Sequence, residues 1–197
     1  METNVQNVIV GSLLGDGWLD SLSPNTKTTR FRVKYSDRSF GYLNWLREQV
    51  RELEPCEPKP IKRYPQHTFY TRANSELGKL RMKFYPNEGE KRVPKDIADL
   101  LKDPISLAIW YQDDGTLDKR KGYHWNSRIA TYCFTYEDCT LLKEAVLKNF
   151  GIEVSVCRNK MRNKVYFELY VLSKSMERFI ETVKPFIHND FKYKIRR

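Results

Sequence analysis

The sequence has no apolar run long enough to cross a membrane and no leader of the secretory type. No stretch approaches the roughly 20 apolar residues that a membrane-spanning helix needs. The amino terminus, Met1-Glu2-Thr3-Asn4, lacks the basic segment followed by an apolar segment that marks a signal peptide. We therefore expect an intracellular protein, cytoplasmic or organellar, with no membrane partner.

Cysteine and histidine are too scarce and too scattered to build a metal site. No C-x-x-C pair is present, which argues against structural zinc. Cys133 falls in a predicted strand and Cys139 in a predicted helix, so we expect both as buried free thiols in a reducing compartment. The cysteines and histidines are Cys56, Cys133, Cys139, Cys157, His67, His124 and His188.

The chain is basic, and its two halves are equally basic. Of 197 residues, 35 are Lys or Arg and 25 are Asp or Glu, which gives a net charge of +10. Residues 1–98 and residues 99–197 each carry +5 of this excess. Because Lys and Arg dominate binding to phosphate backbones, two halves that contact one nucleic acid would explain the even division.

The hydrophobic pattern of the first half predicts three helices and two hairpins. In the strand at 29–35, Arg30, Arg32 and Lys34 point one way, while Phe31, Val33 and Tyr35 point the other. The predicted helices are 5–14, 40–53 and 77–84, and the predicted strands are 18–22, 29–35, 61–64 and 68–72.

The second half repeats this order of elements. Asp103-Pro104 is typical of a helix start, Thr135 can cap the next helix, and Gly151 can end it. The predicted helices are 105–112, 136–149 and 175–183, and the predicted strands are 117–121, 127–133, 154–158 and 164–170. The repeat predicts an α+β fold of two pseudo-twofold αββαββα halves, 1–94 and 95–197.

Two apolar helices that end in an acid and a glycine carry a resemblance to a known family. The segments are Ile9-Val-Gly-Ser-Leu-Leu-Gly-Asp-Gly17 and Leu107-Ala-Ile-Trp-Tyr-Gln-Asp-Asp-Gly115. Each is followed by a basic hairpin, and together they resemble the two motifs of single-chain LAGLIDADG homing endonucleases. The resemblance implies that the motif helices pack side by side between the halves, with Gly11, Gly15 and Ala108 as small residues at the contact. The family's other small positions hold Ile109 and Asp113 in the second copy.

The resemblance also implies a metal-dependent active site. Asp16 and Asp114 would bind Mg²⁺, together with backbone oxygens near Gly15 and with Asp113 as a secondary candidate; Mn²⁺ or Ca²⁺ would suit the same site. Lys91 and Lys194 match the family's basic residues near each active site. They would position water or offset charge, with a phosphate contact or a solvated lysine as the alternative. The family's glutamine is replaced by Lys34 or Tyr35 in the first half and by Tyr132 in the second, whereas Asp20 and Asp118 are expected as solvated hairpin residues.

Two four-stranded antiparallel sheets would form a saddle along the major groove of DNA. Each basic residue on the strands fits either a DNA contact or a solvated strand face, and the tryptophans and most other aromatics are expected to pack. The candidate DNA contacts are Arg30, Arg32, Lys34, Lys62, Arg72, Lys119, Lys121, Arg128, Arg158, Lys160, Lys164 and Tyr166.

The expected function is that of a monomeric, site-specific endonuclease acting on double-stranded DNA, intron-encoded or free-standing. The same fold also occurs in RNA maturases that assist intron splicing and in DNA-binding proteins that no longer cleave. Retention of both Asp16 and Asp114 favours the nuclease, because a protein that only binds DNA has no need to place two carboxylates against phosphate.

Overall fold

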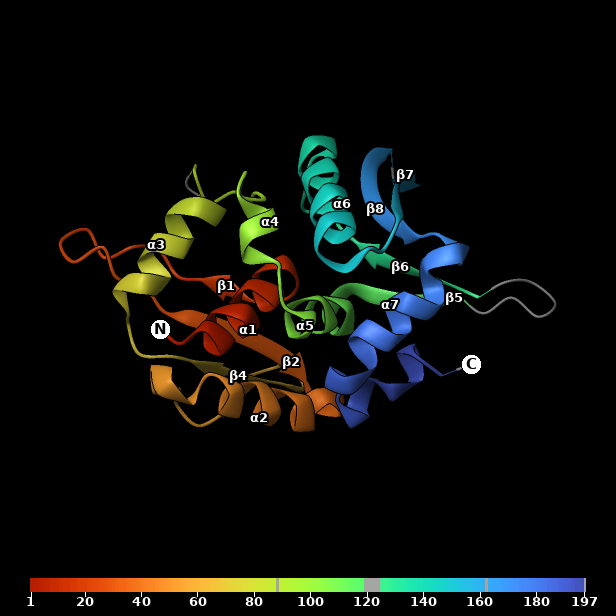
Figure 1. Cartoon of the computed structure of the whole chain (residues 1–197). Helices are drawn as coiled ribbons and strands as arrows, with labels where there is room; N and C mark the ends of the chain where they lie inside the picture. Colours follow the sequence, from red (N-terminus) through yellow and green to blue (C-terminus); the bar gives the residue numbers. More distant parts are fainter. Residues whose placement is uncertain (88, 119–124, 162, 197) are drawn as a thin grey trace.

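The computed structural model describes residues 1–87, 89–118, 125–161 and 163–196 as an α+β fold (Figure 1). The first half contains α1 (Thr3–Leu14), β1 (Trp18–Leu19), β2 (Phe31–Ser36), α2 (Phe40–Gln49), β3 (Lys59–Pro60), β4 (Gln66–Tyr70) and α3 (Ser75–Phe84). After the short α4 (Ile97–Leu100), the second half contains α5 (Pro104–Asp114), β5 (Gly115–Asp118), β6 (Asn126–Ala130), α6 (Tyr136–Phe150), β7 (Val154–Met161), β8 (Lys164–Val171) and α7 (Met176–Val183). The predicted order of helices and strands is confirmed in both halves.

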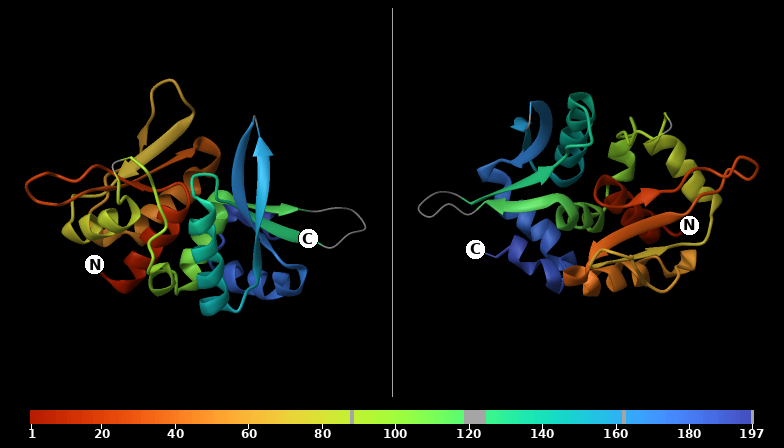
Figure 2. Two further views of the ribbon diagram at one scale, coloured as in Figure 1. Left: turned by 90° about the horizontal axis from the view of Figure 1, so that it is seen from above. Right: turned by 180° about the vertical axis from the view of Figure 1, so that it is seen from behind.

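The strands form two four-stranded antiparallel sheets, which also confirms the prediction. The strand orders are β1-β2-β4-β3 and β5-β6-β8-β7, so the two sheets have the same topology. Seen from above, the β3–β4 and β7–β8 hairpins project toward the same side of the molecule, one from each half (Figure 2). Over the described residues, no helix is both long and apolar enough to span a bilayer.

Helices α1 and α5 lie side by side at the centre of the molecule, between the two sheets (Figure 1). Their backbones approach closely at Gly11, where an added Cβ would lie 2.5 Å from the backbone oxygen of Ser106. The Ser106 hydroxyl donates a 2.8 Å hydrogen bond to the backbone oxygen of Asn7. Ser106 is thus the small residue that faces Gly11, and no glycine is needed at Ile109 for the helices to meet.

The predicted helix ends are present and explain where α5 and α6 lie. The Asp103 side chain accepts a 2.9 Å hydrogen bond from the Ile105 amide, and Pro104 occupies the first turn of α5. Thr135 and Asp138 form a reciprocal capping box at the start of α6. Gly151 ends α6 with φ of +64°, a backbone conformation that glycine adopts without strain. These local signals confirm the positions of the two helices.

Two predicted strands are wrong in their bounds because turns take their place. The segment 61–64 is the turn of the β3–β4 hairpin, in which Arg63 has φ of +73° and the Tyr64 amide bonds to the Ile61 oxygen. Strand β6 ends at Ala130, and a turn follows in which the Phe134 amide bonds to the Thr131 oxygen. Cys133 lies in this second turn and is exposed, so the prediction of a buried thiol is wrong there, whereas Cys139 is buried.

The strand register decides which side chains share the concave face of each sheet, the face away from the buried core. In β2, Phe31, Val33 and Tyr35 are buried, so Arg32 and Lys34 lie on the concave face as predicted. In β8, Leu169 is buried and Tyr166 alternates with it, but Val165 is 55% exposed because the β7–β8 hairpin extends past the core.

The predicted face of two basic residues on β7 is wrong. Arg158 pairs with Phe167 and Lys160 pairs with Val165. Directly paired residues in an antiparallel sheet project to the same face. Phe167 packs against Tyr136 of α6, with ring centroids 5.5 Å apart. Arg158 and Lys160 therefore lie on the helix side of the sheet, opposite Lys164 and Tyr166.

Candidate active site

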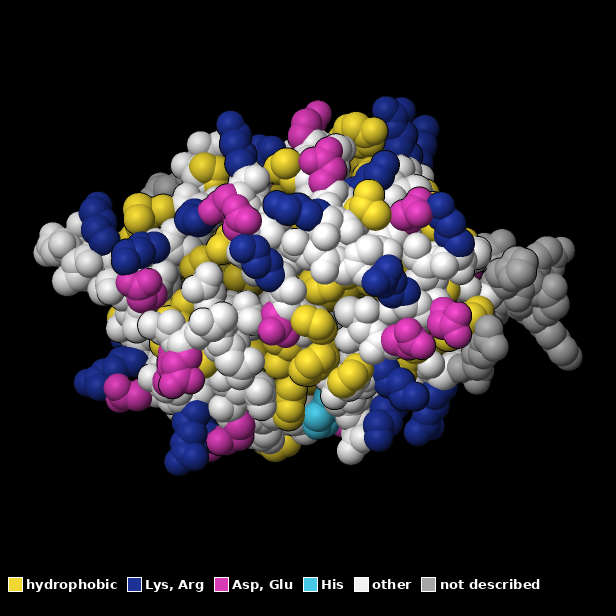
Figure 3. All heavy atoms as spheres, in the orientation of Figure 1, with side chains coloured by type: hydrophobic (Ala, Val, Ile, Leu, Met, Phe, Trp, Pro, Cys, Tyr) yellow, Lys and Arg dark blue, Asp and Glu magenta, His cyan; other side chains and the backbone are white. Residues whose placement is uncertain are grey.

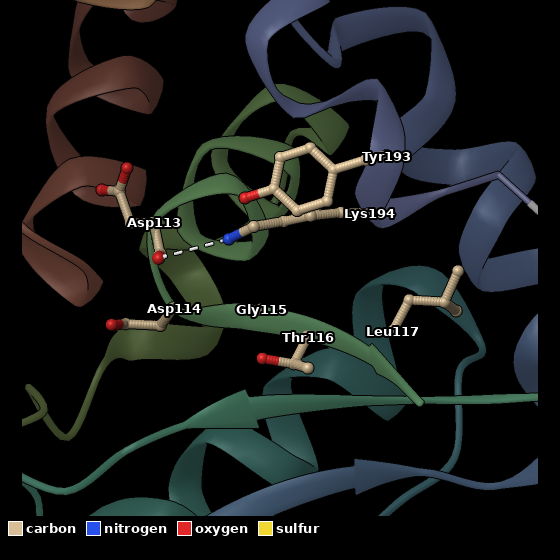
Figure 4. Close-up of a pocket in the computed structure, with 7 residues that line it drawn as sticks. All are labelled: Asp113, Asp114, Gly115, Thr116, Leu117, Tyr193 and Lys194. Atoms are coloured by element: carbon tan, nitrogen blue, oxygen red, sulfur yellow. Dashed lines mark hydrogen bonds between the residues drawn. The ribbon is translucent and has the colours of Figure 1, made fainter. Parts of the chain in front are cut away.

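Asp16 and Asp114 lie at the adjoining ends of the paired helices. Asp114 is the last residue of α5, whereas α1 ends at Leu14 and Asp16 follows its cap residue, Gly15. A pocket of about 360 Å³ opens beside Asp114, lined by Asp113, Asp114, Gly115, Thr116, Leu117, Tyr193 and Lys194. The polar ends of these side chains point toward the end of α1 (Figure 4). The charge of Asp16 acts on Asp114, so the two motif carboxylates lie near each other.

A lysine lies against the end of each motif helix. The Lys91 ammonium donates hydrogen bonds to the backbone oxygens of Gly15 and Gly17, at 3.0 and 2.8 Å. The Lys194 ammonium donates to the backbone oxygen of Gln112 at 2.5 Å. It also donates to the backbone oxygen of Asp113 at 3.4 Å (Figure 4). Carbonyl groups at a helix C-terminus carry partial negative charge, which both ammonium groups offset.

These contacts exclude the alternative that Lys91 and Lys194 are freely solvated. Lys194 is only 8% exposed and Lys91 is half-buried, so neither is a freely solvated lysine. Burial lowers the pKa of both ammonium groups, while nearby carboxylates, including Asp16 and Asp114, raise it. Each lysine therefore places a proton donor beside one motif carboxylate.

The pKa values of both motif carboxylates are raised. Burial raises the pKa of Asp114 to about 7, and the charge of Asp16 adds to this effect. Burial also raises the pKa of Asp16, whereas Lys91, Lys194 and Lys34 lower it. Two like charges that are held together in a partly buried site disfavour ionisation, and a cation between them would relieve this cost.

Asp113 differs from its neighbour Asp114 in that its side chain is fully engaged. Oδ2 accepts a 3.1 Å hydrogen bond from the Asp16 amide. Oδ1 accepts hydrogen bonds from the hydroxyls of Tyr35 and Tyr42, at 2.8 and 3.3 Å. Burial and the charge of Asp16 raise the pKa of Asp113 well above its ordinary value.

The donor set fits a hard divalent cation such as Mg²⁺. In the described part of the chain, no group of three or more His, Cys, Asp or Glu side chains could hold a metal ion. Two carboxylates are nevertheless available, and the carbonyls of Gly15 and Asp113 each keep a lone pair beyond the bond from lysine. Oxygen ligands from carboxylates, carbonyls, water and phosphate are those that Mg²⁺ and Ca²⁺ prefer.

The concave face of the first sheet is cationic and has one central aromatic ring. The Arg30 and Arg32 guanidinium groups and the Lys59 ammonium lie 5.4, 4.8 and 5.2 Å from the centre of the Tyr70 ring. Lys34 is exposed two residues along β2 from Arg32. Four cations therefore cover this face of the sheet.

Asp20 moderates that charge and is not simply solvated, contrary to the prediction. Its carboxylate forms a two-point contact with Arg32, with nitrogen–oxygen distances of 3.2 and 2.9 Å. Arg72 pairs with Glu54 at 2.8 Å and is largely exposed, and Lys62 is exposed in the turn after β3.

The concave face of the second sheet carries a mixed polar network. Arg128 lies 3.7 Å from Asp118 and 3.5 Å from Glu168, so the prediction of a simply solvated Asp118 is also wrong. The Asn159 amide donates to the Tyr132 hydroxyl at 3.1 Å. Tyr132 also packs against Tyr166, with ring centroids 5.3 Å apart, while Lys164 is exposed at the start of β8. Two predicted contacts, Lys119 and Lys121, lie outside the described residues.

Sequence reasoning missed several residues at the site. Tyr42 and Tyr193 lie in helical segments far from the motifs, and Thr116 follows the second motif, so no motif marks any of them. Tyr35 is buried as expected, but nothing in the alternation of β2 shows that its hydroxyl reaches Asp113. Trp18 was expected only to pack; it pairs with Arg32 and lies half-buried on the concave face.

The most similar relatives found include RNA maturases. The chain is 26% identical to cytochrome b mRNA maturase bI2 of Saccharomyces cerevisiae over 99% of this chain and 48% of the relative. It is also 26% identical to bI2 of Debaryomyces hansenii, over 99% of this chain and 74% of the relative. A RecA protein of Mycolicibacterium flavescens matches at 26%, over 95% of this chain and 45% of the relative. The chain thus spans about half the length of some relatives that it matches.

Solved structures share the fold of the whole chain. The homing endonuclease I-WcaI bound to its DNA recognition sequence superposes with a TM-score of 0.79 at 21% identity, over 99% of this chain and 87% of that chain. I-DmoI in complex with DNA and Mn superposes with a TM-score of 0.57 at 15% identity, over 92% and 96% of the two chains. The model of the LAGLIDADG DNA endonuclease family matches residues 6–179. The protein belongs to the LAGLIDADG DNA endonuclease family.

Proposed function

We propose that this protein is a site-specific endonuclease that hydrolyses both strands of a DNA duplex as a single chain. The observation that carries the proposal is the duplicated site: Asp16 and Asp114 at the adjoining ends of α1 and α5, with a lysine bound to the backbone oxygens at each end. A protein that cuts two strands needs two such groups, and a pseudo-twofold chain supplies them. Relatives of the same fold were solved with DNA and Mg, Mn or Ca.

Asp16 and Asp114, with the backbone oxygens of Gly15 and Asp113, would hold the divalent cation. When bound, Mg²⁺ supplies positive charge that stabilises the transition state and lowers the pKa of water. The carboxylates fix the site by their position at the ends of two packed helices, and they would accept hydrogen bonds from water directed at the phosphate. Lys91 and Lys194 lie close enough to offset phosphate charge and to hold a proton near the reacting oxygens.

The concave faces of the two sheets would bind the duplex on either side of this site. The exposed cations of the first sheet suit phosphate contacts, which provide most of the affinity for DNA. The amide, hydroxyl and carboxylate groups of the second sheet suit base edges in the major groove. The face shown in Figure 3 instead mixes positive and negative side chains. On α3, Lys79 and Lys83 pair with Glu76 and Asp96.

A cleavage selection tests the proposal. The purified chain is incubated with a library of randomised DNA duplexes in Mg²⁺ or in EDTA, and the new ends are captured and sequenced. We expect cleavage of both strands at one long site in Mg²⁺ and none in EDTA. Duplex binding without cleavage in Mg²⁺ or Mn²⁺ would contradict the nuclease assignment.

An RNA maturase is the second candidate, because two relatives that align with 99% of this chain are named as cytochrome b mRNA maturases. Competition separates the two functions. If the chain is a nuclease, a cleavable DNA duplex should displace it from structured intron RNA, and the reverse preference would favour the maturase.

Divalent cation binding should weaken as the pH falls through about 7, the pKa of Asp114. The ionised carboxylate binds the cation, so a proton competes for it; because the fold raises this pKa, competition begins near neutral pH. We expect the affinity for Mg²⁺ to fall about tenfold per pH unit below this pKa and to level off above it. Calorimetric titrations with Mg²⁺ at a series of pH values measure this affinity. In Asp114→Asn, the change in affinity near pH 7 should disappear. An affinity that stays flat would contradict the assignment.

A further inference from the structure

Asp113 reaches from the second half of the chain into the first. It stands directly before Asp114, as Gly15 stands directly before Asp16, so the two residues occupy equivalent positions of the two motifs. A Cβ added to Gly15 would lie 2.5 Å from Oδ2 of Asp113 and 2.6 Å from its Cβ. The Asp113 side chain therefore fills the space that glycine leaves open at the end of α1.

The carboxylate of Asp113 binds a backbone amide that α1 leaves without a partner of its own. The Gly15 amide donates to the oxygens of Gly11 and Ser12, and the Gly17 amide donates to Ser12 at 2.7 Å. Between them, the Asp16 amide donates to Oδ2 of Asp113 at 3.1 Å. Helix α5 continues through Asp114, so the second motif needs no equivalent contact. The first motif cannot make the equivalent contact to the end of α5, because the residue at the matching position is Gly15, which has no side chain.

The other oxygen of Asp113 is anchored to the first half of the chain. The Tyr35 hydroxyl of β2 and the Tyr42 hydroxyl of α2 both donate to Oδ1. The two rings are buried and meet edge to face, with centroids 5.1 Å apart. Three groups from the first half thus fix one side chain from the second. Both oxygens of the Asp113 carboxylate thus accept hydrogen bonds within the protein. The contact with Asp16 is made to its backbone amide and does not use its side chain.

We propose that Asp113 is a positioning residue, which sets the backbone of Asp16 and so makes the first active site depend on the second half of the chain. The inference rests on the proposed function, since it assigns a role at that same site. The proposed role affects only one of the two motif carboxylates: loss of Asp113 displaces Asp16 and leaves Asp114 in its helix. The two DNA strands should therefore respond unequally.

Amide hydrogen exchange tests the contact without any reaction. In Asp113→Ala, we expect the Asp16 amide to exchange about tenfold faster than in the wild type, because its only acceptor among the described contacts is lost. The Gly17 amide, bonded to Ser12, serves as the internal control and should keep its protection. Asp113→Asn retains an oxygen for the amide and a donor for the tyrosines, so it should restore most of the protection.

Strand-specific cleavage tests the consequence. With the two strands labelled differently, Asp113→Ala should slow cleavage of one strand about 100-fold and of the other less than fivefold, so that nicked duplex accumulates. Asp113→Asn should largely restore the slow strand. Tyr35→Phe, which keeps the bond between Asp113 and Asp16, should produce a smaller bias in the same direction and provides a test if the alanine variant folds poorly.

Three results would overturn the inference. Equal slowing of both strands would show a general structural effect. Unchanged exchange at Asp16 in Asp113→Ala would show that the contact does not hold the backbone. Equal loss of Mn²⁺ affinity in Asp113→Asn and Asp113→Ala would identify Asp113 as a metal ligand. If the wild type cleaved no DNA, the proposed function would fail, and the exchange measurement would still decide whether Asp113 positions Asp16.

Discussion

Replacing Asp16 or Asp114 by asparagine is expected to reduce DNA cleavage by about 1,000-fold, which corresponds to roughly 4 kcal/mol of lost transition-state stabilisation. Asparagine keeps the size of the side chain but removes the charge that would hold a divalent cation. Because each carboxylate belongs to one of the two motif ends and both strands must be cut, each should be required for double-strand cleavage. Single-turnover cleavage of the selected duplex in Mg²⁺ measures the effect.

The neutral variants should still fold and bind DNA. Asparagine at position 16 removes the charge that raises the pKa of Asp114, and asparagine at position 114 removes a carboxylate whose charged form burial disfavours. The metal-free variants should therefore be at least as stable as the wild type near neutral pH. Asp20→Asn is the matched control. Its carboxylate lies in the same half but bonds to Arg32, and we expect its cleavage rate to stay within about tenfold of the wild type. Cleavage by either active-site variant at the rate of this control would contradict the assignment.

The parts of the fold that follow from local chemistry could be predicted from the sequence. The spacing of apolar residues located both motif helices, and Asp103, Thr135 and Gly151 marked helix ends that the structure contains. These features depend on residues that are near one another in the chain, so periodicity and capping report them directly. The pairing of α1 with α5 was instead implied by the resemblance to the LAGLIDADG family.

The faces of some strand residues were predicted wrongly, and contacts between distant segments could not be predicted. Arg158 and Lys160 lie on the helix side because they alternate in step with the buried Val154, along a strand that continues to Met161, beyond its predicted end at residue 158. The turn at Arg63 has a positive φ at a residue that does not favour it, so no sequence signal marked it. A side chain that crosses between two repeats is equally invisible to local patterns, because Tyr35 and Tyr42 lie more than 70 residues from Asp113.

The motif could be predicted but the role of Asp113 could not, because a sequence motif describes one half at a time and Asp113 acts on the other half. The family motif describes what each half contributes to its own helix end. Asp113 instead contributes to the helix end of the other half, where Gly15 leaves space for it. A substitution that looks like a departure from the small-residue pattern is therefore accommodated at the contact between the halves. Such a residue is found only when both repeats are present in three dimensions.

Gly11→Val should destabilise the protein by about 3 kcal/mol and lower its melting temperature by about 10 °C. An added Cβ would lie 2.5 Å from the oxygen and 2.9 Å from the Cα of Ser106, and backbone atoms in a packed helix cannot move aside. Eight of the twelve residues of α1 are buried, so separating α1 from α5 opens the centre of the molecule. Gly11→Ala should show the same direction with a smaller loss. Thermal unfolding followed by circular dichroism measures both.

The same variant links stability to the site, because α1 and α5 carry Asp16 and Asp114 at their ends. If Gly11→Val forces the two helices apart, Mg²⁺ should bind more weakly even below the unfolding temperature, where the protein is still folded. Asn4→Val is the matched control: it places the same residue on an exposed position of α1 and should melt within about 2 °C of the wild type. If Gly11→Val melted with this control, the close helix contact would not hold the halves together. If it melted early but bound Mg²⁺ normally, the carboxylates would not depend on that contact for their position.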